Sequence, residues 1–138
     1  MARILAIDYG SKRVGLAVTD PGQIIATGLE TIHSSGVIDY LKNYCSQEEV
    51  EAFVVGEPKH LDNTPSQSAE LINNFVKHLE RTFPNKAIHR VDERFTSTIA
   101  QQTLLTSGKK KKARQDKSLL DTISATLILQ SYLERSKL

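Results

Sequence analysis

The stretch RILAIDYGSKRVGLAVTD, residues 3–20, decides the fold. Its first part, residues 3–8, is a short, nearly continuous apolar run, which is typical of a strand buried on both faces. A turn containing glycine separates it from a second apolar run at 14–20, and a Pro-Gly turn follows. Residues 24–32 then predict a third strand, with Gly28 as a bulge or break. Because these strands follow one another closely, we expect an antiparallel meander.

The rest of the chain alternates between helical spacing of apolar residues and short apolar runs. The expected elements are a helix over 37–45 with Ser34 or Ser35 as its cap, a strand at 52–58, a helix from Thr64, a strand at 87–95, a short helix at 97–106 and a final helix at 118–135. This order predicts an α/β fold, in which a mixed five-stranded sheet (a three-stranded antiparallel meander plus two parallel strands) is flanked by helices. With no linker or internal repeat, residues 1–138 are expected to form a single domain.

The composition excludes several classes of protein. The chain has 138 residues, of which 39% are apolar, so it can build one core. Its single cysteine, Cys45, excludes an internal disulfide framework and a zinc site built on several thiolates. The four histidines form no close pair, so a metal would be held mainly by oxygen. Neither a bilayer-spanning run nor a secretory leader is found, and we therefore expect a cytoplasmic protein.

The net charge of +2 hides an uneven distribution. Residues 109–117, KKKKARQDK, contain six bases and one acid, whereas the first 108 residues carry a net −3. A basic run is usually a solvated loop, but it also suits a phosphate backbone because each lysine that displaces a counterion adds affinity. The charge pattern alone therefore leaves both readings open.

Acidic residues lie at the ends of the predicted buried strands. Asp8 ends the first strand, Glu57 ends the strand at 52–58, and Asp92 and Glu93 lie in the strand at 87–95. For any one of them a helix cap or a salt bridge is the simpler explanation, because an unpaired carboxylate is costly to desolvate. Several acids at equivalent ends of neighbouring strands instead indicate a site, since ligands gather beyond the carboxyl ends of parallel strands.

The final helix contributes a further acid. At 100° per residue, Asp121 shares one face with Ala125, Ile128 and Tyr132, so that face must pack on the sheet. Contact with the helix dipole is the alternative role for this aspartate. Converging carboxylates suit Mg²⁺ or Mn²⁺, and two such ions about 4 Å apart can clamp a phosphodiester. Acids that hold metal, together with bases that hold a nucleic-acid backbone, are what a nuclease needs.

Four segments carry a resemblance to a known family. They are IDYGSKRVGLAVTD (7–20), VVGEPKHLDN (54–63), VDERFTSTIAQQTL (91–104) and LLDTISATLILQSYLE (119–134). In this order and spacing they resemble the YqgF family, also called RuvX, of the ribonuclease H-like superfamily that includes the RuvC-type Holliday-junction resolvases. The resemblance implies a ribonuclease H-like fold over nearly the whole chain.

The resemblance also implies roles for particular residues. By motif, the family's acidic triad falls on Asp8, Glu93 and Asp121, which are expected to coordinate one or two Mg²⁺ or Mn²⁺ ions. Glu57 departs from the family pattern, which has leucine there; it is either a fourth metal ligand or a partner of Lys59. The candidate nucleic-acid contacts are Lys12, Arg13, Arg94, Thr96, Lys109, Lys110, Lys111, Lys112 and Arg114.

Four functions remain open at this point. The resemblance implies a metal-dependent endonuclease that processes the 5′ end of pre-16S rRNA, in association with the ribosome, as a monomer or weak homodimer without a membrane. The first alternative is resolution of four-way DNA junctions, which requires a dimer whose two sites face one junction. The second is ATP binding by the loop after Asp8, although actin-like kinases need a second domain. The third is a non-catalytic nucleic-acid or transcription-factor-binding module.

Overall fold

The computed structural model describes residues 2–57, 69–92 and 117–136, and in these ranges the chain forms one five-stranded mixed sheet in the order β3-β2-β1-β4-β5. The strands are β1 Arg3–Tyr9, β2 Arg13–Thr19, β3 Ala26–His33, β4 Val50–Glu57 and β5 Ala87–Asp92. The first three form an antiparallel meander, while β4 runs parallel to β1 and β5 runs parallel to β4. The predicted sheet is confirmed, both in its strand count and in its mixture of directions.

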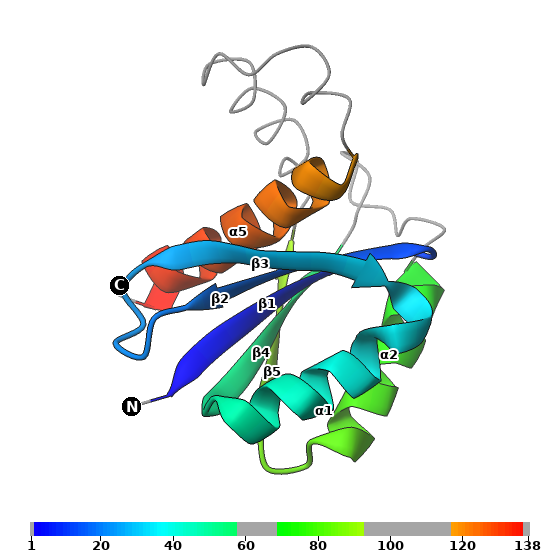
Figure 1. Ribbon diagram of the computed structural model, residues 1–138, viewed down its shortest axis with the longest axis horizontal. Helices are drawn as coiled ribbons and strands as arrows, with labels where there is room; N and C mark the ends of the chain where they lie inside the picture. Colours follow the sequence, from blue (N-terminus) through cyan, green and yellow to red (C-terminus); the bar gives the residue numbers. More distant parts are fainter. Residues whose placement is uncertain (1, 58–68, 93–116, 137–138) are drawn as a thin grey trace.

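Helices cover both faces of the sheet (Figure 1). One face carries α1 Val37–Gln47 and α2 Ala69–Thr82, and the other carries α5 Lys117–Ser136. Alternate residues of β1 serve the two layers: Leu5 and Ile7 join the core under α1 and α2, whereas Ile4 and Ala6 join the core under α5. This explains why the first apolar run is continuous, since both of its faces are buried.

The two cores differ in the size of their side chains. The core under α1 and α2 contains large residues such as Phe53, Leu41 and Leu79, all fully buried. The core under α5 includes small residues such as Ala6 and Ala17. Small side chains allow a helix to approach the strands closely, so α5 lies nearer to the sheet's backbone than a leucine-rich layer would permit.

Two glycines show how close this approach is. A Cβ atom on Gly15 would lie 2.2 Å from the carbonyl oxygen of Asp121, and one on Gly28 would lie 2.4 Å from Cγ2 of Thr122. The hydroxyls of Thr31 and Thr122 are 2.7 Å apart and join β3 to α5. Glycine in a strand interior often marks such a contact, and here it fixes the first described turns of α5 against β2 and β3.

Some strand and helix boundaries in the structure differ from the predicted ones. Residues 24 and 25 belong to the loop before β3, and the β2–β3 register shifts opposite Gly28, which confirms the predicted irregularity there. The predicted serine cap of α1 is wrong. A short 3₁₀ turn over Ser34–Gly36 comes first, with His33 Nδ1 accepting from the Ser35 amide, and α1 starts after Gly36 without a side-chain cap.

Other predictions fall wholly or partly on residues outside the described ranges. These are the helix start at Thr64, the last residues of the strand at 87–95, the short helix at 97–106 and the basic run. The final helix, predicted at 118–135, is confirmed as Lys117–Ser136. Within the described ranges, none of the helices combines the length and apolar character needed to cross a bilayer.

Candidate functional site at the carboxyl end of β1

A cavity of about 250 Å³ opens at the carboxyl end of β1. It is lined by Asp8, Gly10, Ser11, Lys12, Arg13 and Asp121. Its walls therefore come from the end of β1, the β1–β2 turn and the start of the described part of α5. Two carboxylates and two cations share this one small space, although Asp8 and Asp121 are 113 positions apart in the sequence.

The β1–β2 turn is held in a defined shape. The Gly10 amide donates to the Arg13 carbonyl at 3.0 Å, and a Cβ atom on Gly10 would lie 2.7 Å from that same oxygen. Ser34 fixes the other side of the turn: its hydroxyl donates to the Ser11 carbonyl at 2.8 Å and its amide to the Lys12 carbonyl at 3.0 Å. A turn anchored in this way presents Lys12 and Arg13 to the cavity from a fixed backbone.

The close packing of α5 is what brings the two aspartates together. Asp8 pairs with Gly15 in the β1–β2 ladder, and the missing side chain of Gly15 leaves room for the backbone of Asp121. Because side chains alternate along a strand, Asp8 faces the α5 side, as Ile4 and Ala6 do. The predicted inward face of α5 is confirmed, since Ala125 and Ile128 are buried against the sheet.

Arg13 forms an ion pair with Asp121. Its Nε atom lies 2.8 Å from Oδ2 of Asp121, and the two side chains are 44% and 22% exposed. The sequence predicts Arg13 as a candidate nucleic-acid contact. In the structure its guanidinium is the salt-bridge partner of Asp121. Nearly half of the Arg13 side chain remains open to solvent and available to a ligand.

The other predicted acids lie partly or wholly outside what the structure describes. The backbones of Glu57 and Asp92 are paired in the β4–β5 register, at the same carboxyl edge of the sheet as Asp8. Glu93 follows Asp92 directly, beyond the end of β5. Further candidates outside the described ranges are Arg94, Thr96, Lys109, Lys110, Lys111, Lys112 and Arg114.

The donor chemistry of the described part fits a hard divalent cation. Asp8 and Asp121 offer carboxylate oxygens, which Mg²⁺ and Mn²⁺ prefer. Within the described residues no group of three or more His, Cys, Asp or Glu side chains gathers around one point. A complete ligand set would therefore need at least one more carboxylate, and Glu93 is the next residue in the sequence after β5.

Sequence reasoning missed the residues that position the site. Gly15 and Gly28 admit α5, and Ser34 anchors the β1–β2 turn. A glycine inside an otherwise apolar strand is a usable signal for close backbone approach, so Gly15 could have been singled out. Ser34 gives no such signal, because its partners Ser11 and Lys12 are more than 20 residues away.

The fold and the site together define a class of protein. The mixed sheet with strand order β3-β2-β1-β4-β5 and helices on both faces is a ribonuclease H-like fold, with acidic residues at the carboxyl edge of the sheet. A solved structure of Thermus thermophilus RuvC in complex with a Holliday junction substrate has the same fold. It matches with a TM-score of 0.55 and 14% identity, over 99% of this chain and 96% of that one.

The particular family follows from the sequence comparisons. The chain belongs to the RuvX family, described as "Holliday junction resolvase", whose model matches residues 2–135. A Flavobacterium johnsoniae protein named "Putative pre-16S rRNA nuclease" is 56% identical over 137 residues, which is 99% of each chain. A Bacteroides fragilis protein of the same name is 50% identical over 138 residues, the full length of both. The predicted family is confirmed, and with it the class of nuclease.

Proposed function

We propose that this protein is a divalent-metal-dependent endonuclease that hydrolyses phosphodiester bonds in pre-16S rRNA near its 5′ end. The observation that carries the proposal is the convergence of Asp8 and Asp121 on one cavity beside Lys12 and Arg13. Full-length relatives at 50–56% identity that bear the pre-16S rRNA nuclease name support the choice of substrate.

Each residue has a proposed role. Asp8, Asp121 and Glu93 would hold Mg²⁺ or Mn²⁺, with Glu57 as an additional donor from the end of β4. When bound, such an ion would polarise the phosphoryl group and lower the pKa of a water molecule bound to it. Arg13 positions Asp121 through the 2.8 Å contact from its Nε atom, and its exposed guanidinium can reach a phosphate oxygen. Lys12 adds a second cation at the same rim.

The residues outside the described ranges complete the proposal. Arg94 and Thr96 would contact the substrate or position Glu93. The basic run, with Lys109 to Lys112 and Arg114, would hold the RNA backbone through contacts that do not depend on its sequence. We further propose that residues 1–138 act as one domain and that the protein works in the cytoplasm, where precursor rRNA is found.

Cleavage of four-way DNA junctions is the second candidate, because the family model is described by that activity. Symmetric resolution needs two sites facing one junction and therefore a dimer on the DNA. The two substrates thus differ in the oligomeric state they demand. If the protein stays monomeric on a junction and cuts only RNA, junction resolution is excluded and pre-16S rRNA cleavage is supported.

The decisive experiment compares the wild-type protein with Asp8→Asn, Glu93→Gln and Asp121→Asn. Each is assayed with Mg²⁺ or Mn²⁺ on a pre-16S rRNA fragment and on a four-way junction. We expect each substitution to lower cleavage by roughly 10²-fold or more, the scale for losing one preorganised electrostatic contact, while binding is largely retained. Full binding and function in all three variants would instead indicate a non-catalytic binding module.

A further inference from the structure

A second surface lies at the opposite, amino-terminal end of β1. There the loop Asp20–Ile25, which joins β2 to β3, exposes two neighbouring isoleucines: Ile24 is 66% and Ile25 is 62% exposed. Among the described large apolar side chains, only Leu71, at 37%, is also classed as exposed. Apolar side chains held adjacent to one another in water are typical of a protein-binding surface.

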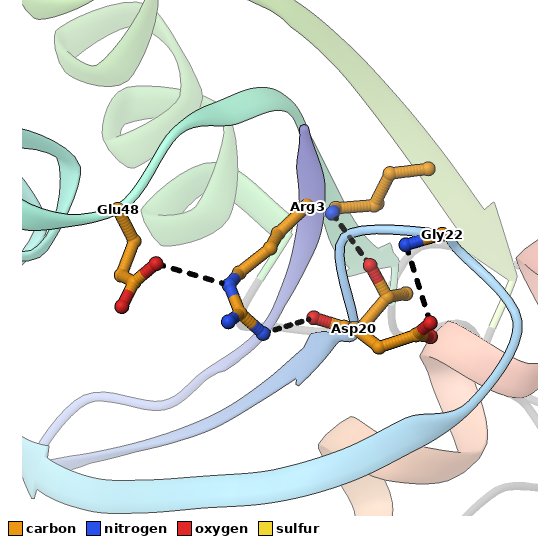
Figure 2. A network of polar contacts seen from close by, with 6 residues as sticks. Arg3, Asp20, Gly22 and Glu48 are labelled. Atoms are coloured by element: carbon orange, nitrogen blue, oxygen red, sulfur yellow. Dashed lines mark hydrogen bonds and ion pairs between the residues drawn. The ribbon is translucent and has the colours of Figure 1, made fainter. Parts of the chain in front are cut away.

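The loop that presents them is held rigidly. Oδ1 of Asp20 accepts the amides of both Ile24 and Ile25 at 2.8 Å, and Oδ2 accepts the Gly22 amide at 3.2 Å. Figure 2 shows the Asp20–Gly22 contact beside the side chain of Arg3. Gln23 adopts a left-handed φ of 58°, an unusual conformation outside glycine. Because the loop is already ordered, it would lose little further conformational freedom when a partner binds.

Acidic groups and a cavity adjoin the loop. The Gln23 side chain donates to the Ala2 carbonyl at 2.9 Å and also to the Glu51 carboxylate. Glu51 and Glu49, both exposed, line a cavity of about 450 Å³ together with Phe83, Pro84 and Lys86, whose ammonium donates to the Val50 carbonyl. The loop that carries the two isoleucines is therefore joined to this cavity by the contact between Gln23 and Glu51.

The charge at this end selects the kind of partner. Glu48 is paired with Arg3 at 3.4 Å (Figure 2). The charged groups that line the cavity are the carboxylates of Glu49 and Glu51 and the ammonium of Lys86, so acids outnumber bases there. Carboxylates repel a phosphate backbone, so this surface is unsuited to RNA. Proteins that coat an RNA are basic, because they neutralise its phosphates. Such a protein would meet complementary charge here and an apolar contact at Ile24 and Ile25.

We propose that the surface formed by Ile24, Ile25, Glu49 and Glu51 docks a basic protein segment that carries an apolar side chain. The inference rests on the proposed function, because the partner is a basic protein bound to the precursor rRNA. Docking at one end of β1 would leave the cavity at the other end facing the RNA. The surface would thereby select substrate RNA that is already packaged with protein.

The test measures binding rather than cleavage, so it does not depend on the proposed activity. Fluorescently labelled wild-type protein and the Ile24→Ser/Ile25→Ser variant are titrated with naked pre-16S rRNA and with precursor small-subunit particles. Serine keeps both amides that Asp20 accepts, so the loop is expected to fold. We expect the variant to bind particles about tenfold more weakly, the scale for losing an apolar anchor, and to bind naked RNA unchanged. Leu71→Ser is the matched control and should bind both as the wild type does.

Three results would overturn the proposal. Wild-type affinity of the double variant for particles would show that the isoleucines contact no protein there. An equal loss on naked RNA would assign the surface to nucleic acid. A wild-type dimer in analytical ultracentrifugation that the double variant lacks would assign it to a second copy of the chain. Absence of cleavage by the wild-type protein, measured separately, would instead contradict the proposed function and leave the binding result interpretable.

Discussion

The two ends of β1 use the same kinds of side chain for different purposes. At the amino end, Asp20 accepts three backbone amides and Arg3 lies between Glu48 and the Thr19 carbonyl, so these charged groups bind the protein's own chain (Figure 2). At the carboxyl end, Asp121 pairs with Arg13, yet it and Asp8 also line an open cavity. A carboxylate at a strand end is thus informative only once its partners are known.

The largest loss of stability and activity is expected for Gly15→Ala at the carboxyl end. The new Cβ atom would lie 2.2 Å from the Asp121 carbonyl, and backbone on both sides leaves little room for adjustment. We expect the free energy of unfolding to fall by more than about 3 kcal/mol, beyond the usual range for overpacking, with cleavage lost as Asp121 is displaced. Urea unfolding and an RNA cleavage assay would measure both.

Gly36→Ala is the matched control for this substitution, because nothing lies within 4 Å of a Cβ atom at that position. Its stability should stay within about 0.5 kcal/mol of the wild type. A mild effect at Gly15, similar to that at Gly36, would show that α5 is not held against β2 as described.

The next largest effect is expected for Thr19→Val at the amino end, which should lower stability without changing activity. The fully buried hydroxyl of Thr19 accepts the Ile4 amide at 2.9 Å. Thr19→Val leaves that buried amide without its acceptor, so we expect a loss of about 1–3 kcal/mol in the free energy of unfolding. Turnover of the folded protein should not change, because the cavity is at the other end of the strand. A large fall in kcat at a temperature where the variant is folded would contradict the claim that only the carboxyl end of β1 takes part in cleavage.

Arg13→Ala should show the opposite behaviour. The pair with Asp121 is partly exposed, with 44% and 22% of the two side chains open to solvent, so its loss should change stability by less than about 1 kcal/mol. Cleavage should nevertheless fall, because Asp121 loses its positioning partner and the RNA loses a cation. Arg13→Lys keeps the charge without the planar guanidinium, and should restore RNA binding more fully than turnover. Unchanged kinetics in Arg13→Ala would make the pair purely structural.

The smallest effect is a pH dependence at Asp20. The amides of Ile25 and Ile24, and then that of Gly22, hold the pKa of this carboxylate below its usual value of 3.8. A lowered folded pKa stabilises the protein above the unfolded pKa, and that stabilisation is lost as the pH falls through the folded pKa. The stability difference between wild type and Asp20→Asn should therefore shrink below about pH 3.8. Urea unfolding from neutral to acidic pH would measure it, and a constant difference would contradict this assignment.

The order of the strands along the chain is predictable from the sequence because the apolar runs are short and separated by clear turn signals. The inward face of α5 follows from helical periodicity, which places Asp121 towards the sheet. The cap of α1 was not predictable, because His33 and a 3₁₀ turn compete with the serines over a few residues. The pairing of Arg13 with Asp121 spans 108 positions and depends on the close packing at Gly15, which only the folded chain reveals.

We propose that the carboxyl end of β1 holds the metal and cuts RNA, whereas the amino end does neither. The most direct measurement is Mn²⁺ binding by calorimetry, together with Mn²⁺-dependent RNA cleavage, for Asp8→Asn and Asp20→Asn under identical conditions. We predict that Asp8→Asn weakens Mn²⁺ binding and lowers cleavage by roughly 10²-fold or more, while Asp20→Asn keeps both near wild-type values. Wild-type metal binding and cleavage in Asp8→Asn would contradict the account.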